Sequence, residues 1–269
     1  MGNVERSVIT SLSNPLVKQA RALRQRKART AMGLFLVEGI HHVGEVVAAG
    51  WEVDTLLYAP DLLTSDFAAA LLEQANNKGI HCQPVSAQVM DSLAGKEHPQ
   101  GILALVRQRD RTLADLSLDQ FRRGVAVVSP QDPGNVGTIL RTIDAIGADG
   151  LIILDGGVDL YHPSCVRASM GTLFWKPVVR TSFDAFLTWS RSKGYHLLGS
   201  STHASLDYRN FDPGNSPWIL LLGSEQKGLS MGQIEACDQT VSLPMHGRAS
   251  SLNLAVAAGI LLYALGEKD

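Results

Sequence analysis

The sequence predicts a mixed α/β protein in which a small α/β unit precedes a larger unit built on a parallel sheet. Short apolar runs with strand character alternate with helical patterns along most of the 269 residues. The runs that follow residue 124 contain almost no polar residues, which is typical of parallel strands buried on both faces. A polar stretch, RDRTLADLSLDQFRRG, separates the two regions.

The length of the chain allows one large domain or two ordinary ones, each with its own core. We expect a first domain at residues 1–107, a linker at 108–123 and a second domain at 124–269. Hydrophobic residues make up 45% of the chain and charged residues 19%, which indicates a folded protein and not a disordered one.

In the first region, Asn14-Pro15 predicts a turn that leads into one basic helix. We expect strands in GLFLVEG, VDTLLYA and GILALVRQ, and helices at residues 40–50 and 65–78, the second closed by Gly79. This alternation favours a small α/β layer structure of about a hundred residues.

In the second region the alternation is clearer. The predicted strands are GVAVVSP, GLIILDGG, YHLLGSS and WILLLGSE. The predicted helices are NVGTILRTIDAIGA, PSCVRASMGTLF, FDAFLTWSRSKG and residues 252–265. Ligands of such sheets bind beyond the carboxyl ends of the strands, where this chain concentrates its polar and glycine residues.

The basic residues are unevenly distributed. Residues 1–30 contain seven Lys and Arg against one acidic residue, Glu5, whereas the remainder has 17 basic and 25 acidic residues. Such asymmetry indicates a nucleic-acid partner, although a solvated helix face would explain the basic run equally well.

Several classes of protein are excluded. The three cysteines lie far apart with no ligand spacing, so we expect reduced thiols, a cytoplasmic protein and no metal site. The apolar run at 252–265 is shorter than the roughly 20 residues that span a bilayer, so we expect a buried helix and no membrane contact. The signatures of dinucleotide enzymes, P-loop NTPases, α/β-hydrolases and zincins are missing from the sequence.

Three polar clusters follow predicted strands. In SPQDPGNVGTILRTIDAIGADG, Asn135 can cap the next helix, and Arg141 lies about a turn and a half further on. In LLLGSEQKGLS, Glu225 stands between glycines directly after a core strand. In LPMHGRASSLNLAV, Ser250 or Ser251 can cap the last helix, with Asn253 in its first turn. Each cluster taken singly is equally well explained by helix capping, with Glu225 or Ser230 as the capping group in the second.

Taken together and in this order, the clusters resemble the three motifs of the SpoU (TrmH-type) RNA ribose 2'-O-methyltransferases of the SPOUT superfamily. DPGNVGTILRTIDAIGADGLIIL resembles motif 1, ILLLGSEQKGLS motif 2 and VSLPMHGRASSLNLAVAAGILLY motif 3. The stretches ITSLSNPLVKQARAL, GLFLVEGIHHVGEVVAAG and HPQGILALV resemble the substrate-binding domain that often precedes the catalytic one. The resemblance covers nearly the whole chain.

The resemblance implies a SPOUT domain whose last segment forms a deep trefoil knot, preceded by an L30e-like α/β/α domain that holds RNA. It implies S-adenosylmethionine as the cofactor, a homodimer, and methyl transfer to a ribose 2'-hydroxyl. Ribosomal RNA is favoured over transfer RNA as the substrate, because the N-terminal module is complete and motif 3 has an SSLN variant.

The resemblance also implies roles for particular residues. The residues that match catalytic positions are Asn135, Arg141, Glu225, Ser251 and Asn253. The residues that match positions around the cofactor are Gly223, Leu243, Met245 and Leu252. The chain departs from the commoner pattern at Ser250, where many members have Glu, and at Gln226, where motif 2 usually has Gly.

Methyl transfer to a ribose hydroxyl requires an in-line approach and removal of a proton from a weakly acidic oxygen. Arg141 is the family's proposed base, but an arginine stays protonated in proteins. Our hypothesis is that Arg141 binds the target phosphate and stabilises the developing alkoxide, with Asn135 and Glu225 orienting it. Neutralisation of RNA phosphates is assigned to basic residues of the N-terminal helix, namely Arg21, Arg24, Arg26, Lys27 and Arg29.

Two other functions remain open from the sequence. One is a catalytically silent RNA-binding protein of the same fold that acts in ribosome assembly; the five retained catalytic-position residues argue against it. The other is an α/β enzyme for a phosphorylated metabolite that uses GSEQKG as an anion loop; the basic N-terminal region and the missing phosphate signatures argue against that.

Overall fold

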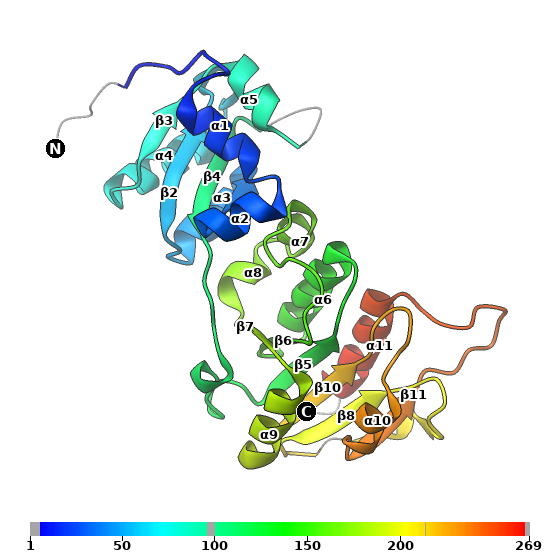
Figure 1. Ribbon diagram of the computed structural model, residues 1–269. Helices are drawn as coiled ribbons and strands as arrows, with labels where there is room; N and C mark the ends of the chain where they lie inside the picture. The colour runs from blue at the N-terminus through cyan, green and yellow to red at the C-terminus, as the bar shows by residue number, and fades with distance from the viewer. Residues whose placement is uncertain (1–5, 96–99, 213, 267–269) are drawn as a thin grey trace. The chain divides into compact units, whose positions relative to one another are not determined.

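The computed structural model describes residues 6–95, 100–212 and 214–266, and these form two compact units (Figure 1). The first unit contains Met1–Arg109 together with Tyr161–Val166, and the second contains Asp110–Leu160 and Arg167–Asp269. The short segment from Tyr161 therefore packs with the first unit although it lies within the sequence of the second. Glu5, His98 and Pro99, which belong to stretches discussed above, lie outside the described residues.

The first unit has a four-stranded sheet in the order β1-β4-β2-β3. Strand β4 runs antiparallel to β1 and β2, whereas β2 and β3 are parallel. The strands are β1 (Leu34–Glu38), β2 (Val53–Tyr58), β3 (Cys82–Pro84) and β4 (Ile102–Arg107). Three of these strands were predicted and are confirmed. Strand β3 was missed, because three residues that include a proline carry little strand signal.

The helices of the first unit include two where one basic helix was predicted. They are α1 (Pro15–Ala22), α2 (Arg26–Met32), α3 (Ile40–Ala48), α4 (Asp66–Asn77) and α5 (Ala87–Leu93), with a 3₁₀ turn at Pro60–Leu62. Asn14 caps α1 by accepting the Leu16 N–H at 2.9 Å, and Pro15 occupies the first helical position. The first helix packs its buried Val17 and Ala20 against the same core cluster as Val89 and Leu93 of α5.

The second unit has a seven-stranded sheet in the order β7-β6-β5-β10-β8-β11-β9, and every neighbouring pair is parallel. The predicted parallel sheet is confirmed. The strands are β5 (Arg123–Val128), β6 (Gly150–Leu154), β7 (Val178–Thr181), β8 (His196–Ser200), β9 (Leu206–Asp207), β10 (Trp218–Leu222) and β11 (Gln239–Ser242). All five residues of β10 are buried, which places this strand at the centre of the unit.

Helices cover both faces of this sheet. The helices of the second unit are α6 (Pro133–Ala145), α8 (Thr172–Trp175), α9 (Phe183–Lys193), α10 (Met231–Glu235) and α11 (Leu254–Gly266), with 3₁₀ turns at Leu113–Asp115 and Tyr208–Asn210. Helix α7 (Pro163–Ala168) begins in the segment that belongs to the first unit. Ala126 and Ile219 of the sheet share a core cluster with Phe186 of α9 and Ile234 of α10. On the other face α6 and α11 lie side by side and pack against each other (Figure 1).

The helix predicted over PSCVRASMGTLF is wrong as a single element. Met170 and Gly171 have φ values of 49° and 95°, so the chain leaves the right-handed helical region and α7 and α8 are separate. Strands β7, β9 and β11 and helix α10 were also missed, since each has five residues or fewer. Within the described residues, every helix is too short or too polar to span a lipid bilayer.

Tyr195 supports a prediction about stability at high pH. Its ring is buried and its hydroxyl donates to the carbonyl oxygen of Phe121. Burial, followed by the nearby Asp149 carboxylate, raises the pKa of Tyr195 to about 12. The protonated form is therefore favoured in the folded state, and this stabilisation is present below the unfolded pKa and lost as the pH rises towards 12.

We expect the free energy of unfolding of the wild-type chain to fall more than that of Tyr195→Phe between about pH 9 and about pH 12. The difference should approach 2 to 3 kcal/mol, roughly the value of two pKa units. Urea unfolding of both chains across this range measures it. Parallel pH profiles would contradict the assignment.

Candidate functional site

Strands β5 and β10 are parallel neighbours, so the segments that follow them meet at one edge of the sheet. Glu225, which follows β10, accepts backbone N–H groups from the segment after β5. Its Oε2 accepts from Gln131 at 3.0 Å, and its Oε1 accepts from Gln131 and from Asp132, each at 3.3 Å. The carboxylate thus lies beside the N-terminus of α6, where the helix dipole and unpaired amides favour a negative charge.

The amide of Asn135 connects Glu225 to the start of the last helix. Its Nδ2 donates to Glu225 Oε1 at 3.2 Å, and its Oδ1 accepts from Asn253 Nδ2 at 3.0 Å. Asn253 Oδ1 in turn accepts the backbone N–H groups of Ala255 at 2.9 Å and Val256 at 3.3 Å. Three residues from three separate polar clusters therefore form one hydrogen-bonded chain, the Glu225–Asn135–Asn253 link.

Two predicted helix caps are corrected by these contacts. Asp132, and not Asn135, caps α6: its Oδ1 accepts from Gly134 at 2.5 Å and from Asn135 at 3.1 Å. Pro133 starts the helix because its missing N–H has no role at the first position. Asn253, and not Ser250 or Ser251, caps α11. Of the two capping groups considered for the second cluster, Ser230 caps a helix, since its side chain accepts the Gln233 N–H at the start of α10.

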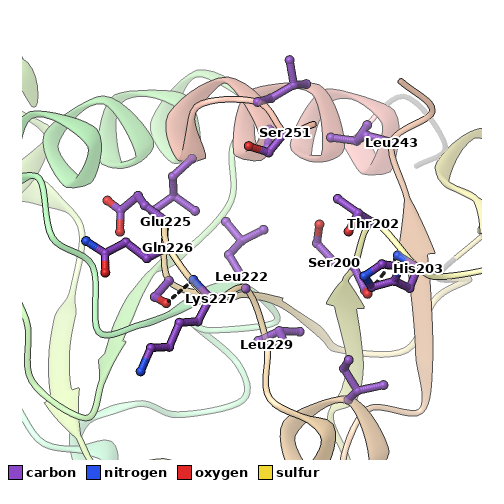
Figure 2. A pocket seen from close by; sticks show the side chains of 18 of the residues that line it. Ser200, Thr202, His203, Leu222, Glu225, Gln226, Lys227, Leu229, Leu243 and Ser251 are labelled. Atoms are coloured by element: carbon purple, nitrogen blue, oxygen red, sulfur yellow. Dashed lines mark hydrogen bonds between the residues drawn. The ribbon is translucent and has the colours of Figure 1, made fainter. Parts of the chain in front are cut away.

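A pocket of about 640 Å³, here called the first pocket, lies beside this link. Its walls come from the ends of β8 and β10 and from the segment that leads into α11. Figure 2 shows Ser251 above Leu222, with Thr202 and His203 on the opposite side of the pocket from Glu225 and Gln226. Six predicted site residues line it: Gly223, Glu225, Leu243, Met245, Ser251 and Leu252.

Gly223 is required by the backbone that folds back over it. A Cβ at this position would lie 2.0 Å from the carbonyl carbon of Gly228 and 2.3 Å from the nitrogen of Leu229. Gly228 has a φ of 64° and donates its N–H to the Ser224 carbonyl at 2.9 Å, which closes the turn. Gln226 is not among the residues with positive φ, so the turn closes without glycine at that position.

The structure does not bring Arg141 into this group. Arg141 is exposed on α6, and among the described residues no hydrogen bond or ion pair to its side chain is found. Asn135 and Asn253 also lie outside the lining of the first pocket and reach it through Glu225 and α11. The guanidinium of Arg141 is therefore available to a ligand that approaches from solvent.

The residues after β8 that line the pocket, from Ser200 to His203, were not predicted from the sequence. The sequence did contain a signal for them, because the predicted strand YHLLGSS ends in two serines and Thr202 and His203 follow it directly. It was weak because these residue types are common in ordinary loops.

The basic residues of the first unit divide into two groups. Arg21, Arg24, Arg26 and Lys27 are exposed, although Arg21 donates to Ser92 Oγ at 3.2 Å and Arg24 to the Leu93 carbonyl at 2.6 Å. Arg29 is only 2% exposed and donates at 2.8 Å to the carbonyls of Leu23 and Arg24. The prediction that Arg29 contacts RNA phosphates is therefore wrong, because its guanidinium is buried and holds the connection between α1 and α2.

No group of three or more His, Cys, Asp or Glu side chains in the described part of the chain is arranged to hold a metal ion. The site instead offers a half-apolar pocket, a carboxylate fixed by backbone amides, and one exposed guanidinium on the adjoining helix. This combination can bind a small polar cofactor and an anionic partner.

Both units are similar to known proteins. Residues 123–263 match the SpoU rRNA Methylase family, and residues 14–104 match the MRM3-like substrate binding domain. The 23S rRNA (uridine(2479)-2'-O)-methyltransferase of Streptomyces viridochromogenes is 37% identical over 95% of this chain and 90% of its own length. The 23S rRNA (guanosine(2553)-2'-O)-methyltransferase of Bacillus subtilis is 31% identical over 96% and 98%.

Among solved structures, an AdoMet-bound rRNA methyltransferase from Sinorhizobium meliloti superposes with a TM-score of 0.87, at 34% identity over 96% of each chain. The sequence match extends over both units. The structure agrees with it in the parallel sheet, in the order of the three polar clusters and in the pocket beside them. The chain belongs to the SpoU rRNA methylase family.

Proposed function

We propose that this chain is an S-adenosylmethionine-dependent methyltransferase that modifies a ribose 2'-hydroxyl of ribosomal RNA. The observation that carries the proposal is the first pocket, whose rim is held by the Glu225–Asn135–Asn253 link. Two relatives that align with nearly the whole chain are named as 23S rRNA 2'-O-methyltransferases, which favours ribosomal RNA as the substrate.

The first pocket fits S-adenosylmethionine in size and chemistry. Its volume of about 640 Å³ is within the usual range for small-molecule sites. Leu222, Leu243 and Leu252 offer apolar surface, whereas Ser251 and the backbone that follows β10 offer hydrogen-bonding groups. When bound, the cofactor supplies a methyl group activated by its sulfonium.

Arg141 is assigned to the RNA. Its guanidinium is exposed and permanently charged, so it can hold a phosphate and stabilise negative charge that develops on the 2'-oxygen. Glu225 and Asn135 act as positioning residues, because they fix the N-terminus of the helix that carries Arg141. Ser251 lines the pocket for the cofactor and the ribose, and Asn253 shapes that pocket through its hydrogen bond to Asn135.

The chain path supports a trefoil knot in the second unit. After β11, which lies beyond β8 and β10 from β5, the chain returns to α11, which packs against α6, the helix that follows β5. The four-stranded sheet of the first unit, with helices α1 to α5, supports an L30e-like module that holds RNA.

An apolar stripe on α11 supports a homodimer. Val256, Ile260 and Tyr263 follow one face of this helix and are 51%, 36% and 53% exposed. Because α6 packs against α11, a dimer joined through this stripe would bring Arg141 close to the subunit boundary. We also propose a cytoplasmic location, which is consistent with ribosomal RNA as the substrate.

The proposal is tested by incubating the purified chain with radiolabelled S-adenosylmethionine and ribosomal RNA from cells that lack the gene. Methyl groups should appear in RNA at positions that resist alkaline cleavage, because a methylated 2'-oxygen cannot attack the neighbouring phosphate. Absence of transfer with retained RNA binding would instead favour the catalytically silent assembly protein.

We expect Arg141→Ala to lower kcat by about a hundredfold or more, the usual effect of removing one group that stabilises a developing charge. Affinity for S-adenosylmethionine should stay within about twofold of wild type, since Arg141 does not line the first pocket. Single-turnover methylation and calorimetric titration measure the two effects. Near-wild-type turnover with bound RNA would rule out this role for Arg141.

A second prediction concerns the first unit. Replacing Arg21, Arg26 and Lys27 together with Gln should weaken RNA binding and reduce the slope of log Kd against log salt by about 0.7 to 0.9 for each phosphate that is no longer neutralised. Cofactor affinity should not change. Filter binding at two salt concentrations measures the slope, and Lys193→Gln on α9 is the matched control. An unchanged slope would remove these residues from the RNA interface.

A further inference from the structure

A second pocket lies on the other side of the turn that follows β10. Its volume is about 550 Å³, and it is lined by Val128, Ser129, Gln131, Ser224, Gln226, Lys227, Gly228, Ser230 and Gln233. Five of these residues, between Ser224 and Ser230, also line the first pocket. One turn of the chain therefore forms a wall common to both pockets.

Two long side chains of this turn point away from the side of the first pocket that Thr202 and His203 form. Figure 2 shows Gln226 and Lys227 directed to the side opposite Thr202 and His203. Both residues are exposed, and among the described residues neither side chain has a hydrogen-bond or ion-pair partner. A long amide and an ammonium group are thus available to a ligand in the second pocket.

Two further glutamines contribute complementary groups. Gln131 donates its Nε2 to the Ser129 carbonyl at 2.8 Å, which leaves its Oε1 as an acceptor. Gln233 accepts the Ser230 N–H on its Oε1 at 2.9 Å, which leaves its Nε2 as a donor. The pocket therefore offers an acceptor, a donor, an amide with both functions and one positive charge. Its lining contains no carboxylate.

This set matches the chemistry of a nucleotide. Side-chain amides pair with the hydrogen-bonding edges of bases, and a lysine binds phosphate as a point charge. Proteins read RNA sequence mainly on unstacked nucleotides, whose edges are free. Among the described residues that line this pocket, Lys227 carries the one charge, and three glutamines provide neutral amides.

We propose that the second pocket binds an unstacked RNA nucleotide, with Lys227 on a phosphate and Gln131 and Gln226 on the edge of the base. The inference rests on the proposed function, because the nucleotide bound here belongs to the RNA whose ribose is methylated at the first pocket. Gln226 and Lys227 then act as specificity-determining residues for the RNA, although both also border the first pocket.

The test uses the full-length chain and compares Gln226→Ala and Lys227→Gln with wild type. RNA affinity is measured by filter binding on unmethylated ribosomal RNA, KM and kcat by methyl transfer, and cofactor affinity by titration with S-adenosylmethionine alone. Each variant should raise the RNA Kd and KM by about five- to tenfold and leave kcat and cofactor affinity within about twofold. Lys227→Arg should restore the phosphate contact, and Lys193→Gln should have no effect.

The inference is overturned if RNA affinity is unchanged in both variants, or if cofactor affinity falls as much as RNA affinity does. The first result would mean that the second pocket is unused, and the second that the turn serves the cofactor only. Both results are independent of turnover, because RNA and cofactor binding are measured separately. An inactive wild-type chain with these binding effects intact would count against the proposed function alone.

Discussion

The amide of Asn135 is the contact on which the geometry of the site depends. It joins Glu225 on one side to Asn253 on the other, and these residues are 90 and 118 positions away in sequence. A side-chain amide suits this position because it donates and accepts at the same time. An aspartate could not donate to Glu225 and would repel its carboxylate, and an alanine would remove one hydrogen bond from each neighbour. This amide ties the start of α11 to α6 and adds to the backbone hydrogen bonds that hold Glu225 at the start of α6.

The rest of the site follows from that fixed turn. Gly223 and Gly228 let the backbone double back so closely that Ser224 and Gly228 form an isolated antiparallel bridge. The turn that results lines both pockets, the one proposed for the cofactor and the one proposed for a nucleotide. Transfer of a small group between two ligands requires them to approach closely while each is held separately. Residues of the turn from Ser224 to Ser230 line both pockets, so this turn can hold the two ligands next to each other.

The sequence predicted the sheet of the second unit and most of its helices because buried parallel strands such as WILLLGSE leave a strong apolar signal. It failed on β3, β9 and α10, which are too short to show a period.

The sequence also placed the caps of α6 and α11 on the wrong residue. Asp132 and Asn135, or Ser251 and Asn253, are equally good caps by residue type, and only tertiary contacts decide between them. Arg29 shows the same limit: a basic run gives charge, but burial of one guanidinium depends on how α1 and α2 pack. The second pocket had no sequence signal, because glutamines after strands are common and their convergence is a property of the fold.

The most direct test of the central role of the link is a double-mutant cycle on cofactor affinity with Asn135→Ala and Asn253→Asp. The aspartate keeps the oxygen that caps α11 but cannot donate to Asn135. If the link orders the first pocket, either change breaks it, and the double variant should bind S-adenosylmethionine about as weakly as the weaker single variant, with a coupling energy of about 1 kcal/mol or more. Affinity losses that simply multiply would contradict the link as the constraint that holds the site together.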